Sequence, residues 1–238
     1  MKQIIDRRRG MTNISDRLID NLTLDWEGLD IPSGTSGTWT ERANGNSFII
    51  SQGDATLNAG QSIIMNNGKN VYVSPTITKN NPIDAVTCII TFHYVSGFPA
   101  SSSGYIIGYN SNNTSASLFG NSNDQWSYPF YCGWPTRRWL NAFDSPFTAP
   151  STSIIHHLAF RLIWDTVAGA ALRCWTNGYN TYNDYAGDQL FPGCPDSIYL
   201  VGTDLVLRLH AFRMYNVGLT DDEILQSYQN DLSIYGNY

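Results

Sequence analysis

The stretch HHLAFRLIWDTVAGAALRCWTNGYN, residues 156–180, decides the fold of this chain. It contains two short runs rich in apolar, β-branched and aromatic residues, which are separated by small residues and closed by an Asn-Gly pair. Runs of this length between turn residues are typical of β-strands. The stretch therefore predicts strands at Ile155–Trp164 and Ala171–Thr176.

The same pattern continues outward over most of the chain. The strongest strand of the first half is VTCIITFHYV at Val86–Val95, which is apolar on both faces and is expected inside a sheet covered on both sides. Further short strands are predicted at 22–26, 48–51, 55–58, 61–65, 71–73, 76–79, 105–109, 116–119, 130–134, 138–143, 197–201 and 205–215. No helix separates them, so alternating strand and helix units are excluded, and the regular spacing indicates a sandwich or barrel.

One helix is predicted near the end of the chain. Thr220 followed by Glu223 forms a capping box, in which the hydroxyl accepts from the Glu223 N–H and the carboxylate accepts from the Thr220 N–H. Leu219 and Ile224 occupy the two positions of a hydrophobic staple. We expect this helix to run to about Gln229 and to lie across the outside of the sandwich or close one end.

Composition limits the class of protein. The 238 residues are 42% hydrophobic and 13% aromatic, which excludes a disordered chain. Glu and Lys, both good helix formers, occur three times each, which favours strands and turns. No run of eighteen apolar residues is present to span a membrane. A net charge of -6 disfavours nucleic-acid binding by the body of the domain, because phosphate contacts need a basic face.

Residues 1–20 are predicted to be a docking arm, and residues 21–238 to be the folded domain. Asp6 and the arginines that follow it interrupt the apolar stretch that a secretory signal needs, so export by that route is not expected. The arm is suited to bind phosphate or an acidic partner. Its basic side chains are Lys2, Arg7, Arg8 and Arg9.

Three segments together resemble the laminin-G-like, concanavalin-A-like jelly roll. Residues 156–180 are similar to the family's WHHVA-type strand with its following hairpin and a strand ending in NG. LRLHAFRMYNVGLTDDEI at 207–224 is similar to the family's FRIYNRALTDEEI ending, and LTLDWEGLDIPSGTSGTWTERANGNSF at 22–48 is close to its start. The resemblance spans residues 22–235, with 96–153 unmatched. It implies an all-β jelly-roll sandwich of two antiparallel sheets with a short C-terminal helix and an N-terminal arm.

The carboxylates do not predict glycosidase chemistry. The fold hosts lectins, glycosidases, adhesion modules and virion proteins alike, so function has to come from a site. Glycosidases of this fold resemble one another in a strand with two Glu flanking an Asp at alternate positions, one acting as nucleophile and another as acid. Here Glu223 caps the helix, and Glu27 and Glu41 lie at a strand end and in a loop without such a partner. No nucleophile elbow or phosphate loop is present, and we predict that the chain is not an enzyme.

Histidines and cysteines are predicted to be structural. His156 and His157 are neighbours on a strand, so they point to opposite faces and cannot chelate one ion together. His93 and His210 lie within apolar strands and are expected in the core. The four cysteines lack the spacing of a zinc site and are expected to be buried thiols, with Cys174–Cys194 as the pair if one disulfide forms.

No cofactor is predicted, and calcium is the one metal that stays an alternative. Jelly-roll relatives often hold calcium with loop carboxylates and carbonyls. None of the acidic residues here forms a recognisable loop motif, so turn formation is the favoured role. The candidates by residue type are Asp25, Asp30, Asp54, Asp184 and Asp188.

Two stretches place aromatic residues among polar turn residues, DQWSYPFYCGWPTRRW at 124–139 and NGYNTYNDY at 177–185. Aromatic faces beside Asn and Asp suit a sugar ring, and they equally suit a protein interface. Part of each set is expected in the core. The candidates for glycan binding or an interface are Trp126, Tyr128, Tyr131, Trp134, Trp139, Tyr179, Tyr182 and Tyr185.

These observations favour a bacteriophage virion structural protein, such as a decoration, fibre or tail-associated subunit. Such a protein is assembled in the host cytoplasm, docks on other virion proteins through residues 1–20, forms a homo-oligomer and presents loops to host glycans. The alternative from another class is a free carbohydrate-binding lectin module of a bacterium. A third hypothesis is a degenerate or atypical glycosidase that uses pairs of Asp residues.

Overall fold

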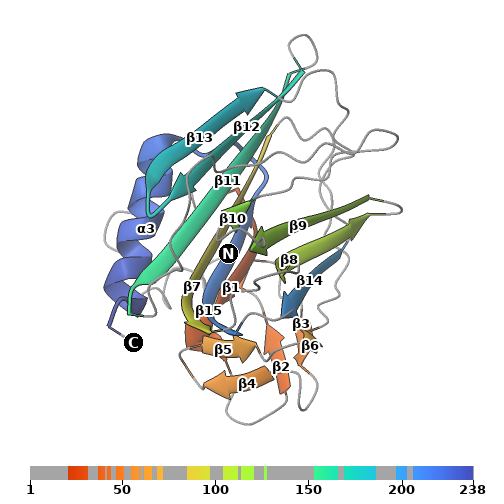
Figure 1. Cartoon of the computed structure of the whole chain (residues 1–238), viewed down its shortest axis with the longest axis vertical. Helices are drawn as coiled ribbons and strands as arrows, with labels where there is room; N and C mark the ends of the chain where they lie inside the picture. The colour runs from red at the N-terminus through yellow and green to blue at the C-terminus, as the bar shows by residue number, and fades with distance from the viewer. Residues whose placement is uncertain are drawn as a thin grey trace.

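The chain is an all-β jelly-roll sandwich with one C-terminal α-helix in the part that the structure describes, as the sequence predicted (Figure 1). The computed structural model describes residues 21–31, 37–40, 42–43, 47–50, 55–58, 60, 62–65, 69–71, 85–96, 104–111, 114–120, 126–127, 153–165, 169–185, 197–202 and 206–237. The docking arm at 1–20 and the strands predicted at 76–79, 130–134 and 138–143 lie outside these residues. No described helix has the length and apolar character needed to cross a membrane.

The larger sheet has eight antiparallel strands among the described residues. In spatial order they are β13 (Tyr179–Tyr185), β12 (Gly169–Thr176), β11 (Ile155–Asp165), β7 (Ala85–Ser96), β15 (Val206–Tyr215), β5 (Ser62–Met65) and β4 (Ala55–Asn58), and β1 (Leu22–Glu27) also pairs with β15. A short 3-10 helix, η1 (Gly28–Asp30), follows β1. The residue stretch that decided the prediction forms β11, β12 and the start of β13.

The second sheet is smaller and lies on the other side of the long strands from the helix α3 (Asp221–Tyr235) in Figure 1. Its described strands, in spatial order, are β10 (Trp126–Ser127), β9 (Thr114–Gly120), β8 (Gly104–Ser111), β14 (Ser197–Gly202) and β6 (Lys69–Val71). A separate hairpin is formed by β2 (Gly37–Thr40) and β3 (Ser47–Ile50). The predicted architecture of two antiparallel sheets is therefore confirmed.

Strand β7 is buried on both faces, as its apolar sequence predicted. It lies between β11 and β15, and every residue from Thr87 to His93 is buried. Ile89 faces α3, where it packs with Ile224, while Phe92 lies on the opposite face and stacks on His156 at a ring-centroid distance of 5.4 Å. Side-chain alternation along the strand thus supplies both layers of the core.

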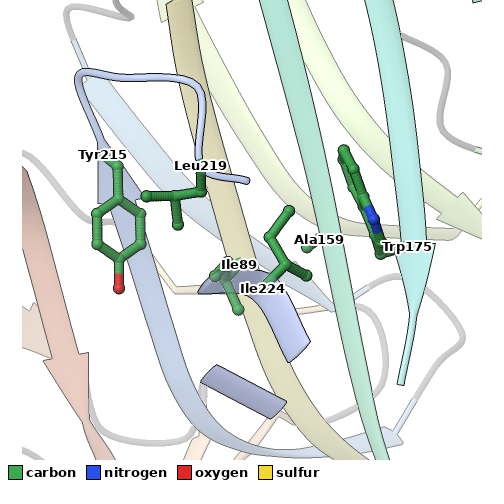
Figure 2. Packing of buried hydrophobic residues seen from close by; sticks show 6 residues of the cluster. All are labelled: Ile89, Ala159, Trp175, Tyr215, Leu219 and Ile224. Atoms are coloured by element: carbon green, nitrogen blue, oxygen red, sulfur yellow. The ribbon is translucent and has the colours of Figure 1, made fainter. Parts of the chain in front are cut away.

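Helix α3 begins with the predicted capping box. Thr220 Oγ1 accepts from the Glu223 N–H at 3.3 Å, and the Thr220 N–H donates to Glu223 Oε2 at 2.7 Å. The staple residues Leu219 and Ile224 are fully buried, in one cluster with Ile89, Ala159, Trp175 and Tyr215 (Figure 2). The helix covers one face of the larger sheet, in agreement with the predicted outside position.

The end of α3 was predicted too early, since the helix continues beyond Gln229 to Tyr235. Its buried side chains recur every three to four residues and include the polar Ser227 and Asp231. Because these buried positions are polar, the second half of the helix lacks the repeat of apolar residues every three to four positions that identifies a helix in a sequence. Tertiary contacts of Asp231 and Tyr235, given below, hold the last two turns in place.

Cys88 and Cys174 are buried thiols, as expected. Burial raises the pKa of the Cys174 thiol above its usual range, because the thiolate would lose its hydration. Cys194, the partner of Cys174 in the alternative disulfide, lies outside the described residues.

Candidate functional site

A buried charge cluster lies where β1, β15 and α3 meet. Arg213 on β15 donates from Nε to Glu27 Oε1 at 2.7 Å, and from Nη1 and Nη2 to the two carboxylate oxygens of Asp231 at 2.9 and 2.7 Å. Tyr235 donates its hydroxyl to Glu27 Oε2 at 2.7 Å. Asp25 Oδ1 lies 3.5 Å from Arg213 Nε. All five side chains are buried, and they form what we call the buried charge cluster.

The cluster places a second carboxylate, that of Asp25, beside Glu27. Asp25 stands two residues before Glu27 on β1, so both side chains lie on the same face of the strand, and both contact Arg213. Glu27 was predicted to have no alternating carboxylate partner of the type that glycosidases of this fold use, and Asp25 does not complete that motif. The available signal was the presence of charged residues inside apolar strands, Asp25 in LTLDWE and Arg213 in VLRLHAFRMY, because buried charges require partners.

The two main carboxyl groups of the cluster are pushed in opposite directions. Burial raises the pKa of Glu27 to about 8, against the opposing effect of Arg213. Burial also acts to raise the pKa of Asp231, but the charge and hydrogen bonds of Arg213 outweigh it and hold that pKa below its usual range. Burial is thus the larger effect at Glu27, and Arg213 is the larger effect at Asp231. Carboxyl pairs of this kind serve acid and base catalysis in open sites, but this pair lies beneath α3 and fastens the helix to the sheet.

Histidines extend the cluster in two directions. His157 on β11 places Nε2 3.3 Å from Ser227 Oγ and 3.9 Å from Asp231 Oδ2. His93 Nδ1 lies 2.7 Å from His210 Nε2, and the His210 ring stacks on Tyr235 at a centroid distance of 4.8 Å. The predictions that these histidines are core residues, and that His156 and His157 face opposite sides, are confirmed.

The exposed candidate site is the turn between β12 and β13 at Asn177 and Gly178 together with the first two residues of β13, and we call residues 177–180 the Tyr179 hairpin. Asn177 and Gly178 have φ angles of 51° and 81°, which matches a two-residue type I′ turn and explains the Asn-Gly pair. Tyr179 follows the turn and is 68% exposed. Among the described large hydrophobic and aromatic side chains, Tyr179 has the largest exposed fraction.

The Tyr179 hairpin is fixed by hydrogen bonds to β11 and by packing against α3. The Asn177 N–H donates to the His157 carbonyl at 2.7 Å, and the His157 N–H donates to Asn177 Oδ1 at 2.9 Å. Gly178 lies against α3, where an added Cβ would stand 2.7 Å from Leu225 Cδ1 and 3.1 Å from Tyr228 Cδ1. Tyr179 is thus an exposed aromatic side chain on a rigid support, which is the arrangement that a binding site for a flat ligand face requires.

The other predicted site residues are placed only in part. Tyr182 and Tyr185 lie on β13, opposite Cys174 and Ala171 of β12, and Trp126 lies on β10, opposite Gly120. The two aromatic stretches therefore belong to edge strands of different sheets. The side chains of these three residues lie outside the description, as do the candidates Tyr128, Tyr131, Trp134 and Trp139 and the arm residues Lys2, Arg7, Arg8 and Arg9.

The calcium candidates have other roles where the structure describes them. Asp25 contacts Arg213, and Asp30 forms a bidentate pair with Arg42 through hydrogen bonds of 2.5 and 3.1 Å. Asp54, Asp188 and the side chain of Asp184 lie outside the described residues. Within the described part of the chain, no three His, Cys, Asp or Glu side chains are grouped to hold a metal ion.

Comparisons with known proteins identify the fold. No family model and no curated protein sequence matches the chain. Among solved structures, the receptor binding domain of botulinum neurotoxin D matches 90% of the chain with a TM-score of 0.68 and 12% identity, over 54% of its own length. Trypanosoma rangeli sialidase matches 100% of the chain with a TM-score of 0.66 and 14% identity, over 38% of its length. The same sialidase in complex with sialic acid matches 92% of the chain with a TM-score of 0.61 and 15% identity, over 34% of its length.

The chain thus spans about a third to about half of the length of the solved proteins that it matches. At these identities the likeness shows the fold, a β-sandwich of the jelly-roll type. It assigns no activity, ligand or site residue to this chain.

The prediction that the chain is not an enzyme is contradicted by the sialidases among these matches. The sequence argument tested one arrangement of carboxylates, and sialidases are among the glycoside hydrolases that depart from it. Hydrolysis therefore has to be measured.

Proposed function

We propose that this chain is a glycan-binding module with a laminin-G-like, concanavalin-A-like jelly roll, and that the Tyr179 hairpin is part of its binding surface. The observation that carries the proposal is the exposure of Tyr179 on a turn fixed by β11 and α3. An exposed tyrosine ring offers an apolar face to the C–H face of a sugar and a hydroxyl for hydrogen bonding. A fixed ring loses little conformational freedom when a ligand binds.

The matched proteins support the same class of ligand. One is named as a receptor binding domain, and another was solved in complex with sialic acid. Sialylated oligosaccharides are therefore the first probes for this chain, with neutral oligosaccharides beside them.

A glycan array carrying sialylated and neutral oligosaccharides tests the proposal on the full chain. We expect a defined set of glycans to bind wild type, Tyr179→Ala to weaken that binding about tenfold, and Tyr179→Phe to keep most of it because the ring remains. Leu29→Ala is the matched control, since Leu29 is also an exposed apolar side chain but lies on η1. No binding by wild type, or equal binding by Tyr179→Ala, would reject the hairpin as a glycan site.

A narrower proposal concerns the setting of the module: a bacteriophage virion protein that docks through residues 1–20. The four basic residues of the arm favour it, since they suit an acidic partner surface. The proteins named above are not virion proteins, so this proposal depends on the arm alone. Deletion of residues 1–20 separates it from a free lectin module: assembly with partner proteins or with itself is lost if the arm docks, whereas glycan binding survives in either case.

Hydrolysis is measured on the same glycans by the release of sugar. Release of sugar by wild type would show that the chain is an enzyme, and the carboxylates of the buried charge cluster would not carry that activity, because they lie beneath α3.

A further inference from the structure

The Tyr179 hairpin and the buried charge cluster meet at one residue, His157. Its backbone N–H and carbonyl both bond Asn177 of the turn, at 2.9 and 2.7 Å. Its side chain points the other way into the interface with α3, where it contacts Ser227 and lies beside Asp231. The ring also lies 5.7 Å from the ring of Tyr228. One residue therefore joins the exposed turn to the helix.

A second contact joins the same two elements directly. Gly178 lies so close to α3 that an added Cβ would stand 2.7 Å from Leu225 Cδ1, 3.1 Å from Tyr228 Cδ1 and 3.3 Å from the Leu225 Cα. Leu225 and Tyr228 are three residues apart and therefore stand on one side of the helix. The turn therefore packs directly against α3.

The attachment of α3 near the hairpin is polar as well as apolar. Ser227 and Asp231 lie on its buried face, and Asp231 is bonded by Arg213 and, at 2.5 Å, by Thr91. Buried ion pairs stabilise less than apolar packing of similar volume, but the loss of one partner is strongly destabilising. The docking of α3 is therefore sensitive to a single change in the buried charge cluster.

We infer that docking of α3 controls the Tyr179 hairpin, with His157 as the positioning residue that couples them. The inference rests on the proposed function, because it concerns the regulation of the same glycan-binding site. While α3 is docked, Gly178 rests on Leu225 and Tyr228, and His157 is held by Ser227. When α3 loosens, the turn loses this support, and its hydrogen bonds to the backbone of His157 open more often. Tyr179 is then no longer fixed, and a glycan has to order the hairpin when it binds.

Amide hydrogen exchange on the full chain tests the coupling without any ligand. The reporter is the Asn177 amide, whose acceptor is the His157 carbonyl. Ser227→Ala removes the side-chain contact with His157, and Asp231→Asn removes the charge that binds Arg213. Ser233→Ala is the matched control, because Ser233 is exposed on the same helix.

We expect the Asn177 amide to exchange about tenfold faster in Ser227→Ala and in Asp231→Asn, which corresponds to about 1.4 kcal/mol of opening free energy. Ser233→Ala should leave the rate unchanged. Ser227→Ala keeps the test decisive if Asp231→Asn does not fold. Faster exchange within α3 together with an unchanged rate at Asn177 would overturn the coupling, and so would unchanged rates throughout.

The same variants on the array of sialylated and neutral oligosaccharides separate the two proposals. If exchange at Asn177 responds and no glycan binds wild type, the coupling stands and the proposed function fails. If Tyr179→Ala weakens binding while Ser227→Ala changes neither binding nor exchange, the function stands and the coupling fails.

Discussion

Arg213 and Asp231 form a fully buried bidentate ion pair, with Nη1 and Nη2 of the guanidinium each within 2.9 Å of a carboxylate oxygen, and this pair attaches the C-terminal helix to the larger sheet. Arg213 comes from the middle of the sheet on β15, and Asp231 comes from the third turn of α3. The pair therefore specifies where the helix lies along the sheet.

Asp231→Ala leaves Arg213 buried with fewer partners, and we expect it to lower the free energy of unfolding by about 3 to 5 kcal/mol. Urea denaturation of the full chain measures this change. Gln229→Ala, at an exposed position of the same helix, should change the free energy by less than about 0.5 kcal/mol. Similar values for the two variants would show that the ion pair does not hold the helix.

Glu27 makes the protein less stable as the solution becomes alkaline. Its pKa is raised from 4.5 in the unfolded chain to about 8 in the fold, so the fold binds the proton more tightly than the unfolded chain does. The resulting stability is fully present below about pH 4.5 and is lost as the pH rises through about 8. Thermal unfolding between about pH 6 and about pH 9 should show this loss in wild type. Glu27→Gln should remove it, and an equal loss in the variant would assign the effect to another group.

His157 makes the protein less stable as the solution becomes acidic. Burial lowers its pKa from 6.5 to about 4 in the fold, although Asp231 partly opposes this shift. The contribution of neutral His157 to the stability of the fold is fully present above about pH 6.5 and is lost as the pH falls through about 4. We expect His157→Gln to reduce the slope of stability against pH in this interval. An unchanged slope would mean that His157 is already charged in the fold.

The capping box makes a separate contribution at the start of α3. Thr220→Ala removes the acceptor of the Glu223 N–H and should cost about 1 kcal/mol. Thr220→Ser keeps an acceptor at the same place and should stay close to wild type in urea denaturation. If both variants lose the same stability, the methyl group of Thr220 and not its hydroxyl is the stabilising part.

The sequence predicted the fold because the central strands are recognisable from their own apolar residues. Strand β7 was predicted at Val86–Val95 and observed at Ala85–Ser96, since a strand between two neighbours is apolar on both faces. Strand β13 was not predicted as a strand. Its sequence YNTYNDY is polar, and an edge strand of this kind is defined by the Asn-Gly turn before it and by pairing with β12.

The candidate site was predicted less well than the fold, for a physical reason. Tyr179 was named from the sequence, but its exposure depends on the contact of Gly178 with α3, more than forty residues later. The buried charge cluster joins Glu27 to Arg213 across 186 residues, so no local pattern could show that the two side chains meet. A charge within an apolar strand indicated that partners exist without indicating which ones.

Titration of wild type and Tyr179→Ala with the oligosaccharide that gives the strongest array signal is the most direct test of a glycan-binding hairpin. Isothermal calorimetry gives the affinity, and thermal unfolding checks that both proteins are equally folded. We predict saturable binding by wild type, affinity lowered about tenfold in Tyr179→Ala, and matching unfolding temperatures. Equal affinities in two equally stable proteins would contradict the account, because the glycan would then bind elsewhere on the jelly roll.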